Sequence, residues 1–192
     1  RLWNGSQWTD FSACPSGFSG KVLLVVHGMA SSIEGAFGGS VNLIKGAGSY
    51  DQVLGFNYDW TDRLESNGQD LATFITDVSS KCLSMTQLDI EAHSEGVPVA
   101  LSGTSRAALD PNNGTRAKTF MKHVVALGGP LKGTPAANDA TNFLSLILHG
   151  NPKATFPNAM DLKNILLRPF IDDLKPASAS LSTIRAAARD QL

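Results

Sequence analysis

One serine lies where a predicted strand turns directly into a predicted helix, a position suited to a nucleophile. Within Met85–Ala100, apolar residues alternate with acidic ones before Ser94, and a proline after it fits the first turn of a helix. Ala92 and Gly96 flank the serine two positions away on each side. A sharp strand-to-helix turn brings the backbones at those two positions together, so large side chains there would clash. The sequence therefore predicts a strained turn that presents Ser94 at a helix N-terminus, where backbone N–H groups favour developing negative charge.

The pentapeptide Ala92–Gly96, Ala-His-Ser-Glu-Gly, resembles the nucleophile elbow of the α/β-hydrolases. The usual first glycine is an alanine here, as in some small bacterial lipases. By this resemblance Ser94 is the catalytic nucleophile, and the backbone N–H of Glu95 is one donor of the oxyanion hole. The Glu95 side chain is expected mainly to suit the helix dipole. The alternative for the pentapeptide taken alone is that Ser94 is an ordinary helix N-cap.

A second motif follows the apolar run Lys21–Val26, which is typical of a strand buried on both faces of a parallel sheet. This run leads straight into His27 and Gly28. A strand followed by His-Gly also resembles the α/β-hydrolases, whose oxyanion loop lies at this place. The resemblance implies that Met29 supplies the second backbone N–H of the oxyanion hole. It also implies that His27 and Gly28 support this loop, and that His27 is structural rather than a general base.

A third motif, Gly128–Pro135, follows the predicted strand His123–Leu127 and reads Gly-Gly-Pro-Leu-Lys-Gly-Thr-Pro. It resembles a loop of lipases with the same fold. A dinucleotide-binding loop is the competing interpretation, but the Gly-x-Gly-x-x-Gly spacing is missing and the prolines would obstruct a helix that receives a pyrophosphate. The stretch Asp172–Leu181 also resembles lipases, between their cap helices and the next strand.

These motifs predict an α/β fold of the α/β-hydrolase type, a mostly parallel sheet with helices on both faces. Apolar residues at three- and four-residue spacing from Leu64 to Val78 predict a helix that packs on the sheet. Residues 1–19 are expected to form an irregular lead-in held by aromatic side chains. We expect Ser94 at the carboxyl edge of the sheet, with a positive or otherwise strained φ. The predicted strands are 21–26, 52–58, 87–92 and 123–127.

The chain divides into three predicted parts. Residues 1–135 form the N-terminal part of the hydrolase core, 136–175 a helical cap, and 176–192 a helix that leads toward further strands. The cap region is more apolar than one packing face requires, so it is predicted to act as a lid over Ser94 that opens at a lipid interface. Ordinary helices that cover the sheet are the alternative.

The histidine and the acid that would activate Ser94 are not evident in the sequence. His123 begins a strand, at the wrong end of the sheet for catalysis, and His149 falls in the predicted cap. The aspartates that follow Ser94 occupy no predicted strand end. We therefore expect the C-terminal strands of the fold, with the acid and the histidine, beyond Leu192. A separate C-terminal fragment of the same protein is a possible partner, and the chain alone is expected to be incomplete as an enzyme.

The composition of the chain narrows the range of functions that the sequence allows. Net charge is −1 and only 17% of residues are charged, so no basic face indicates nucleic acid, and no apolar run reaches membrane-spanning length. His and Cys residues show no ligand spacing, so neither a metal nor another cofactor is expected. Cys14 and Cys82 form either one disulfide or two buried thiols. Low charge with many Ser, Thr, Asn and Gly residues favours a secreted or extracytoplasmic protein.

The function predicted from these observations is a lipase-like serine hydrolase of carboxylic esters. In it Ser94 forms an acyl-enzyme with an ester or lipid substrate. Amidase, thioesterase and acyltransferase activities stay open, because the same apparatus serves every acyl transfer. The alternative from another class is a non-catalytic, hydrolase-like binding module.

Overall fold

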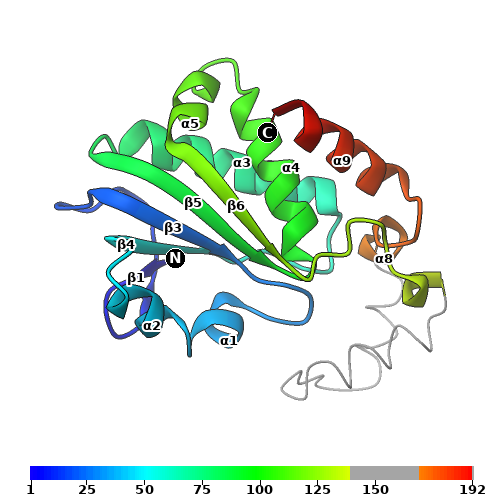
Figure 1. The fold of residues 1–192 in the computed structure, drawn as a ribbon, viewed down its shortest axis with the longest axis horizontal. Helices are drawn as coiled ribbons and strands as arrows, with labels where there is room; N and C mark the ends of the chain where they lie inside the picture. The colour runs from blue at the N-terminus through cyan, green and yellow to red at the C-terminus, as the bar shows by residue number, and fades with distance from the viewer. Residues whose placement is uncertain (139–168, 192) are drawn as a thin grey trace.

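The computed structural model describes residues 1–138 and 169–191, in which one six-stranded sheet lies between two layers of helices (Figure 1). The strand order is β2-β1-β4-β3-β5-β6. β4, β3, β5 and β6 are parallel neighbours, and β1 pairs antiparallel with β2 and β4. The strands are β1 (Leu2–Trp3), β2 (Trp8–Thr9), β3 (Gly20–Val26), β4 (Gln52–Phe56), β5 (Met85–His93) and β6 (Met121–Leu127).

The mostly parallel α/β sheet predicted from the sequence is confirmed, and each of the four predicted strands lies within two residues of its expected ends. The first nineteen residues differ from the prediction, because they contribute two short antiparallel strands rather than an irregular lead-in. The N-terminal amino group of Arg1 donates to Gly55 O at 2.8 Å, and Gly55 N donates to Arg1 O at 2.9 Å. Trp3 and Trp8 meet edge-on with ring centroids 5.4 Å apart.

Helices cover both faces of the sheet, as predicted (Figure 1). α1 and α2 pack beside β3 and β4 on one face, and α3, α4, α5 and α9 lie on the other. The short helix α8 and a 3₁₀ turn lie near the carboxyl edge of the parallel strands. The bounds are α1 (Ile33–Phe37), α2 (Val41–Gly46), α3 (Leu64–Lys81), α4 (Gly96–Ala108), α5 (Gly114–Phe120), the 3₁₀ turn (Pro135–Asn138), α8 (Phe170–Asp173) and α9 (Ala179–Gln191).

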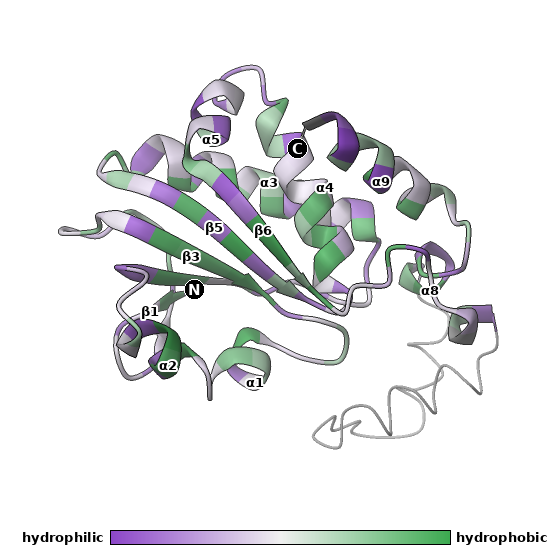
Figure 2. Ribbon diagram, in the orientation of Figure 1, coloured by the Kyte–Doolittle hydropathy of each residue, from purple (hydrophilic) through white to green (hydrophobic). Residues whose placement is uncertain are grey.

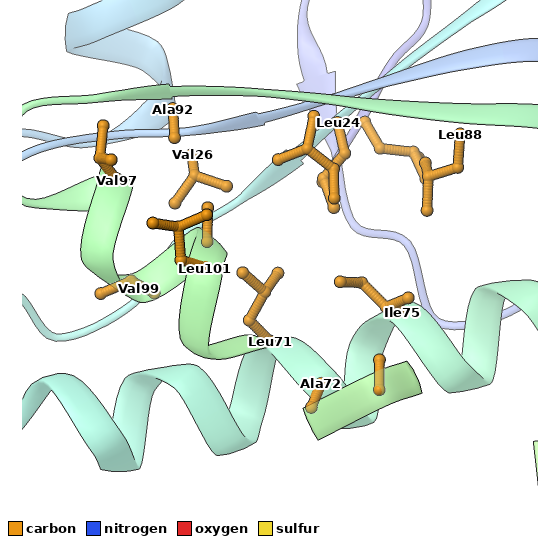
Figure 3. Close-up of a cluster of buried hydrophobic side chains, with 14 of the residues drawn as sticks. Leu24, Val26, Leu71, Ala72, Ile75, Leu88, Ala92, Val97, Val99 and Leu101 are labelled. Carbon is orange, nitrogen blue, oxygen red and sulfur yellow. The ribbon is translucent and has the colours of Figure 1, made fainter. Parts of the chain in front are cut away.

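The larger core lies between the sheet and α3 with α4. Leu24, Val26 and Leu88 point from the strands toward Leu71 and Ile75 of α3 (Figure 3), and each of these side chains is at most 1% exposed. A smaller cluster on the opposite face joins β3 and β4 to α1 and α2. β3 is therefore buried on both faces, which explains its continuous apolar run. β5 differs from β3, because apolar and polar residues alternate along it (Figure 2).

A disulfide joins Cys14 to Cys82, so the structure decides between the two alternatives that the sequence left open. The Cα atoms lie 5.3 Å apart, and Cys82 is the C-cap of α3. The bond therefore fastens the N-terminal segment to the helix that carries much of the core. In the chain-entropy model, a loop closed over a sequence separation of 68 stabilises the fold by about 4 kcal/mol.

Candidate active site

Ser94 forms the turn between β5 and α4. Its φ is 55°, the positive value expected from the sequence, and this conformation costs a non-glycine residue roughly 1–2 kcal/mol. Ser94 N donates to Leu127 O at 2.8 Å, and Val97 N donates to Ser94 O at 3.0 Å. These bonds tie the turn to the end of β6 and to the first turn of α4. The N-cap of α4 is Glu95, without a side-chain cap, so Ser94 is not an ordinary helix N-cap.

Steric contacts explain why the residues two positions before and after the serine are small. A Cβ placed on Gly96 would lie 2.7 Å from Val26 O and closer still to His27 O. Both atoms belong to backbone that cannot move independently of β3. Ala92 is fully buried in β5, where it pairs with Val26 on one side and with Ala126 on the other. The sequence motif therefore reflects how closely the serine turn packs on the end of β3.

The loop after β3 lies directly against the serine. A Cβ on Gly28 would stand 2.8 Å from the Cβ of Ser94 and 2.9 Å from His93 O. Met29 and Ala30 continue this loop, and Ala30 has a φ of 52°. Ser94 and Ala30 are two of the three non-glycine residues with positive φ in the described ranges, and they lie on opposite sides of this contact. Strained backbone of this kind clusters at functional sites.

His27 is held by its backbone surroundings through both ring nitrogens. Nδ1 donates to Gly28 O at 2.8 Å, and Nε2 accepts from Tyr58 N at 3.3 Å. The His27 ring stacks on the Tyr58 ring with centroids 4.3 Å apart, and the Tyr58 hydroxyl donates to His27 O at 2.8 Å. Burial lowers the pKa of His27 below its ordinary value, so the ring is neutral. These contacts orient the loop, and they leave neither nitrogen to act as a base for Ser94.

The Glu95 side chain is turned into the protein and is only 1% exposed. Among the residues that the structure describes, neither of its carboxyl oxygens has a hydrogen-bond partner. Burial raises the pKa of Glu95 well above its ordinary value of 4.5, and the charges of Asp173 and Asp59 raise it further. A helix N-terminus stabilises an anion by at most about 2 kcal/mol, whereas burying an unpaired ion costs several kcal/mol. Burial therefore disfavours the charged form of this carboxyl, whereas the expectation from the sequence was that the side chain mainly suits the helix dipole.

Asp173 of α8 is a structural residue of this edge that the sequence did not reveal. It is 4% exposed and accepts hydrogen bonds from Leu64 N at 3.0 Å and from Ser180 Oγ at 2.8 Å. Arg63 Nη1 lies 3.5 Å from its Oδ1. One carboxylate therefore caps the start of α3 and connects α8 to α9. The resemblance of Asp172–Leu181 to lipases marked this stretch, but it gave no role to the side chain.

The loop Gly128–Pro135 is fastened to the same elements. Thr134 N donates to Leu174 O at 2.8 Å, and Arg185 Nη1 donates to Leu131 O at 3.0 Å. Gly133 has a φ of 80°, and a Cβ there would lie 2.6 Å from Lys175 O. The chain before the 3₁₀ turn and the chain after α8 therefore lie side by side at the carboxyl edge. The rest of the predicted cap, with His149, falls outside the described residues.

His123 lies away from Ser94, as its position at the start of a strand suggested. It pairs across the sheet with Asp89, and its Nδ1 lies 3.0 Å from Asp89 Oδ1. Asp89 precedes Ser94 by five residues, a distance of roughly 16 Å along a strand. Tyr50 also donates to Asp89, at 2.9 Å. The described residues therefore bring together Ser94, the loop at Gly28 and the Glu95 backbone, but they add no histidine–acid pair to them.

A family model described as a domain of unknown function, DUF7379, matches residues 4–165 of this chain. A comparison with curated proteins finds no match. Within residues 1–138 and 169–191, no helix is long and apolar enough to cross a membrane. The same ranges hold no group of three or more His, Cys, Asp or Glu residues that could bind a metal ion.

Solved structures with a similar fold include lipases and a phospholipase. The mature form of the Bacillus licheniformis lipase BlEst2 is 13% identical, with a TM-score of 0.57 over 88% of this chain and 60% of that one. The Legionella pneumophila phospholipase PlaB in complex with thio-NAD is 15% identical, with a TM-score of 0.56 over 88% of this chain and 34% of that one. Aspergillus fumigatus lipase B is 15% identical, with a TM-score of 0.50 over 64% of this chain and 28% of that one.

At these identities the likeness concerns the fold, which is of the α/β-hydrolase type seen in lipases. The chain spans 60% of the mature BlEst2 chain and about a third of PlaB. The activity and substrates of the whole protein are therefore a matter for proposal.

Proposed function

The chain belongs to DUF7379, a family of unknown function, and from its site we propose that it carries the nucleophile of a serine hydrolase acting on carboxylic esters. One observation supports the proposal above all: Ser94 has a φ of 55° at a strand-to-helix turn, with the loop of Gly28 packed against it. An ordinary surface serine gains nothing from a backbone conformation that costs free energy. In a nucleophile the strained turn has a function, because it exposes the hydroxyl at a helix N-terminus.

In the proposed reaction, the Ser94 hydroxyl oxygen attacks the ester carbonyl carbon. The carbonyl oxygen becomes an oxyanion, which the backbone N–H groups of Met29 and Glu95 stabilise. Removal of one such donor in a serine protease costs about 2.7–4 kcal/mol. Collapse of the intermediate expels the alcohol and leaves an acyl group on Ser94, and attack by water then releases the acid. His27 and Gly28 hold the Met29 loop in place.

Ser94 needs a general base to accept its proton, and the proposal assigns this role to a histidine–carboxylate pair outside the described residues. Loss of such a partner lowers the rate of a serine hydrolase by several orders of magnitude. The absence of a pair near Ser94 within residues 1–138 and 169–191 favours a second candidate, a non-catalytic module with a hydrolase fold. The two candidates differ in whether Ser94 reacts with an electrophile.

A lipase-like ester is the proposed substrate class, supported by the fold shared with two lipases and a phospholipase. Amides, thioesters and acyl transfer to an alcohol are the alternatives that the same apparatus would serve. A secreted or extracytoplasmic location is proposed as well. Its support is the Cys14–Cys82 disulfide, since such bonds persist mainly in oxidising compartments.

The test is labelling of the full-length protein with a fluorescent phosphonate that modifies activated serines. We expect labelling of the unmodified protein and of Ser84→Ala, a control at an exposed serine just before β5, and none of Ser94→Ala. Hydrolysis of p-nitrophenyl esters of short and long acyl chains should follow the same pattern. Equal labelling after Ser94→Ala would exclude Ser94 as the nucleophile. No labelling of a folded, unmodified protein would favour the non-catalytic module.

A further inference from the structure

Glu95 has a side-chain carboxyl that the proposed mechanism does not use. Its backbone N–H is a proposed oxyanion donor, while its own carboxyl is buried beside the serine turn without a hydrogen-bond partner. We infer that the Glu95 side chain is an electrostatic determinant of the proposed reaction, which proceeds while this carboxyl is neutral and stops when it ionises. The inference rests on the proposed function of Ser94.

Among the described residues, the groups that interact electrostatically with the Glu95 carboxyl carry no positive charge. Tyr58 and Asp59 face it from the segment between β4 and α3, and Asp173 faces it from α8. Arg63, which pairs with Asp173, is more than half exposed. Burial raises the pKa of Tyr58 well above its ordinary value of 10.0, so its phenol is neutral. Within residues 1–138 and 169–191, an ionised Glu95 would therefore be repelled by two carboxylates and would have no hydrogen-bond partner.

Ionisation would act on the reaction through the position of the charge. The oxyanion is expected at the N–H of Glu95, so a carboxylate on the same residue would repel the charge that forms in the transition state. Because the Glu95 carboxyl is buried, its repulsion is screened less than that of a surface charge. If only the neutral form is active, the rate falls about tenfold for each pH unit above the pKa of Glu95.

The first experiment is a pH profile of kcat/KM for a soluble ester, measured on the full-length protein. We expect an alkaline fall in the unmodified protein that is absent in Glu95→Gln, whose amide has nearly the same shape and cannot ionise. Asp59→Asn removes a charge that disfavours the ionised Glu95, so it should move the fall to lower pH. Asp70→Asn, at an exposed position of α3, should leave the profile unchanged. The same alkaline fall in Glu95→Gln would overturn the inference.

The second experiment separates this inference from the proposed function, because it needs no activity. Infrared spectroscopy of the unmodified protein at neutral pH should show a protonated carboxyl band that disappears at high pH and is missing in Glu95→Gln. Absence of that band at neutral pH overturns the inference even if the enzyme is active. Its presence in a protein that hydrolyses no ester and takes up no phosphonate would support a neutral Glu95 and refute the proposed function instead.

The pH dependence of unfolding is an independent test of whether the buried Glu95 carboxyl is neutral, and its direction can be predicted. The folded-state pKa of Glu95 is raised above 4.5, so the stability that the neutral carboxyl contributes is complete below pH 4.5 and is lost as pH rises through the folded pKa. Between the two pKa values, the unfolding constant of the unmodified protein should rise about tenfold per pH unit relative to Glu95→Gln. A ratio of the two constants that does not change with pH would contradict a neutral, buried carboxyl.

Discussion

Replacing Gly96 by alanine tests whether the serine turn depends on close packing against β3. The added methyl group would lie 2.7 Å from Val26 O and closer to His27 O, so the turn or the strand end must move. Overpacking of this kind costs typically 1–3 kcal/mol. For a domain of this size, that corresponds to a fall in melting temperature of roughly 2–12 °C. The displacement also separates the Glu95 N–H from the loop of Gly28, so the proposed activity should fall more than stability does.

The control is the same substitution at Gly46, the last residue of α2. A Cβ there meets nothing within 4 Å, and alanine is favoured over glycine in a helix by about 1 kcal/mol. Gly46→Ala should therefore raise the melting temperature slightly and leave ester hydrolysis unchanged. Thermal unfolding and kcat/KM of both variants in the full-length protein provide the assay. A Gly96→Ala variant as stable and as active as the unmodified protein would refute the close packing of the serine turn against β3, and so would equal destabilisation by the two substitutions.

Two further predictions concern stability. Asp173→Ala leaves the buried Leu64 N–H without an acceptor, so the free energy of unfolding measured in urea should fall by about 1–3 kcal/mol. The control is Asp172→Ala, at an exposed position beside it, which should change this free energy by less than about 0.5 kcal/mol. Equal losses would contradict the capping role. Replacing both Cys14 and Cys82 by alanine should lower the free energy of unfolding by about 4 kcal/mol. A reductant should then destabilise the unmodified protein but not this variant, and a variant that still responds to reductant would argue against the bond.

The sequence by itself determined the parallel core and the place of the serine turn. β3 could be predicted from one continuous apolar run, and β5 from its alternation, because a buried strand repeats its pattern over neighbouring residues. Ala92, Ser94 and Gly96 are likewise a local motif, and the turn has the predicted positive φ. These features are encoded within a few consecutive residues, so they are readable before any long-range contact is known.

Only the tertiary structure decided features that depend on residues far apart in the chain. β1 and β2 have two residues each, too few to show a period, and they exist because β4 offers an edge to pair with. Asp173 reaches Leu64 across 109 residues, and no local pattern distinguishes it from Asp172. Glu95 occupies a helix N-terminus that suits an exposed anion, yet the surrounding segments bury it. Local sequence sets the conformation of a segment, whereas burial and charge at a side chain are set by whatever the folded chain packs around it.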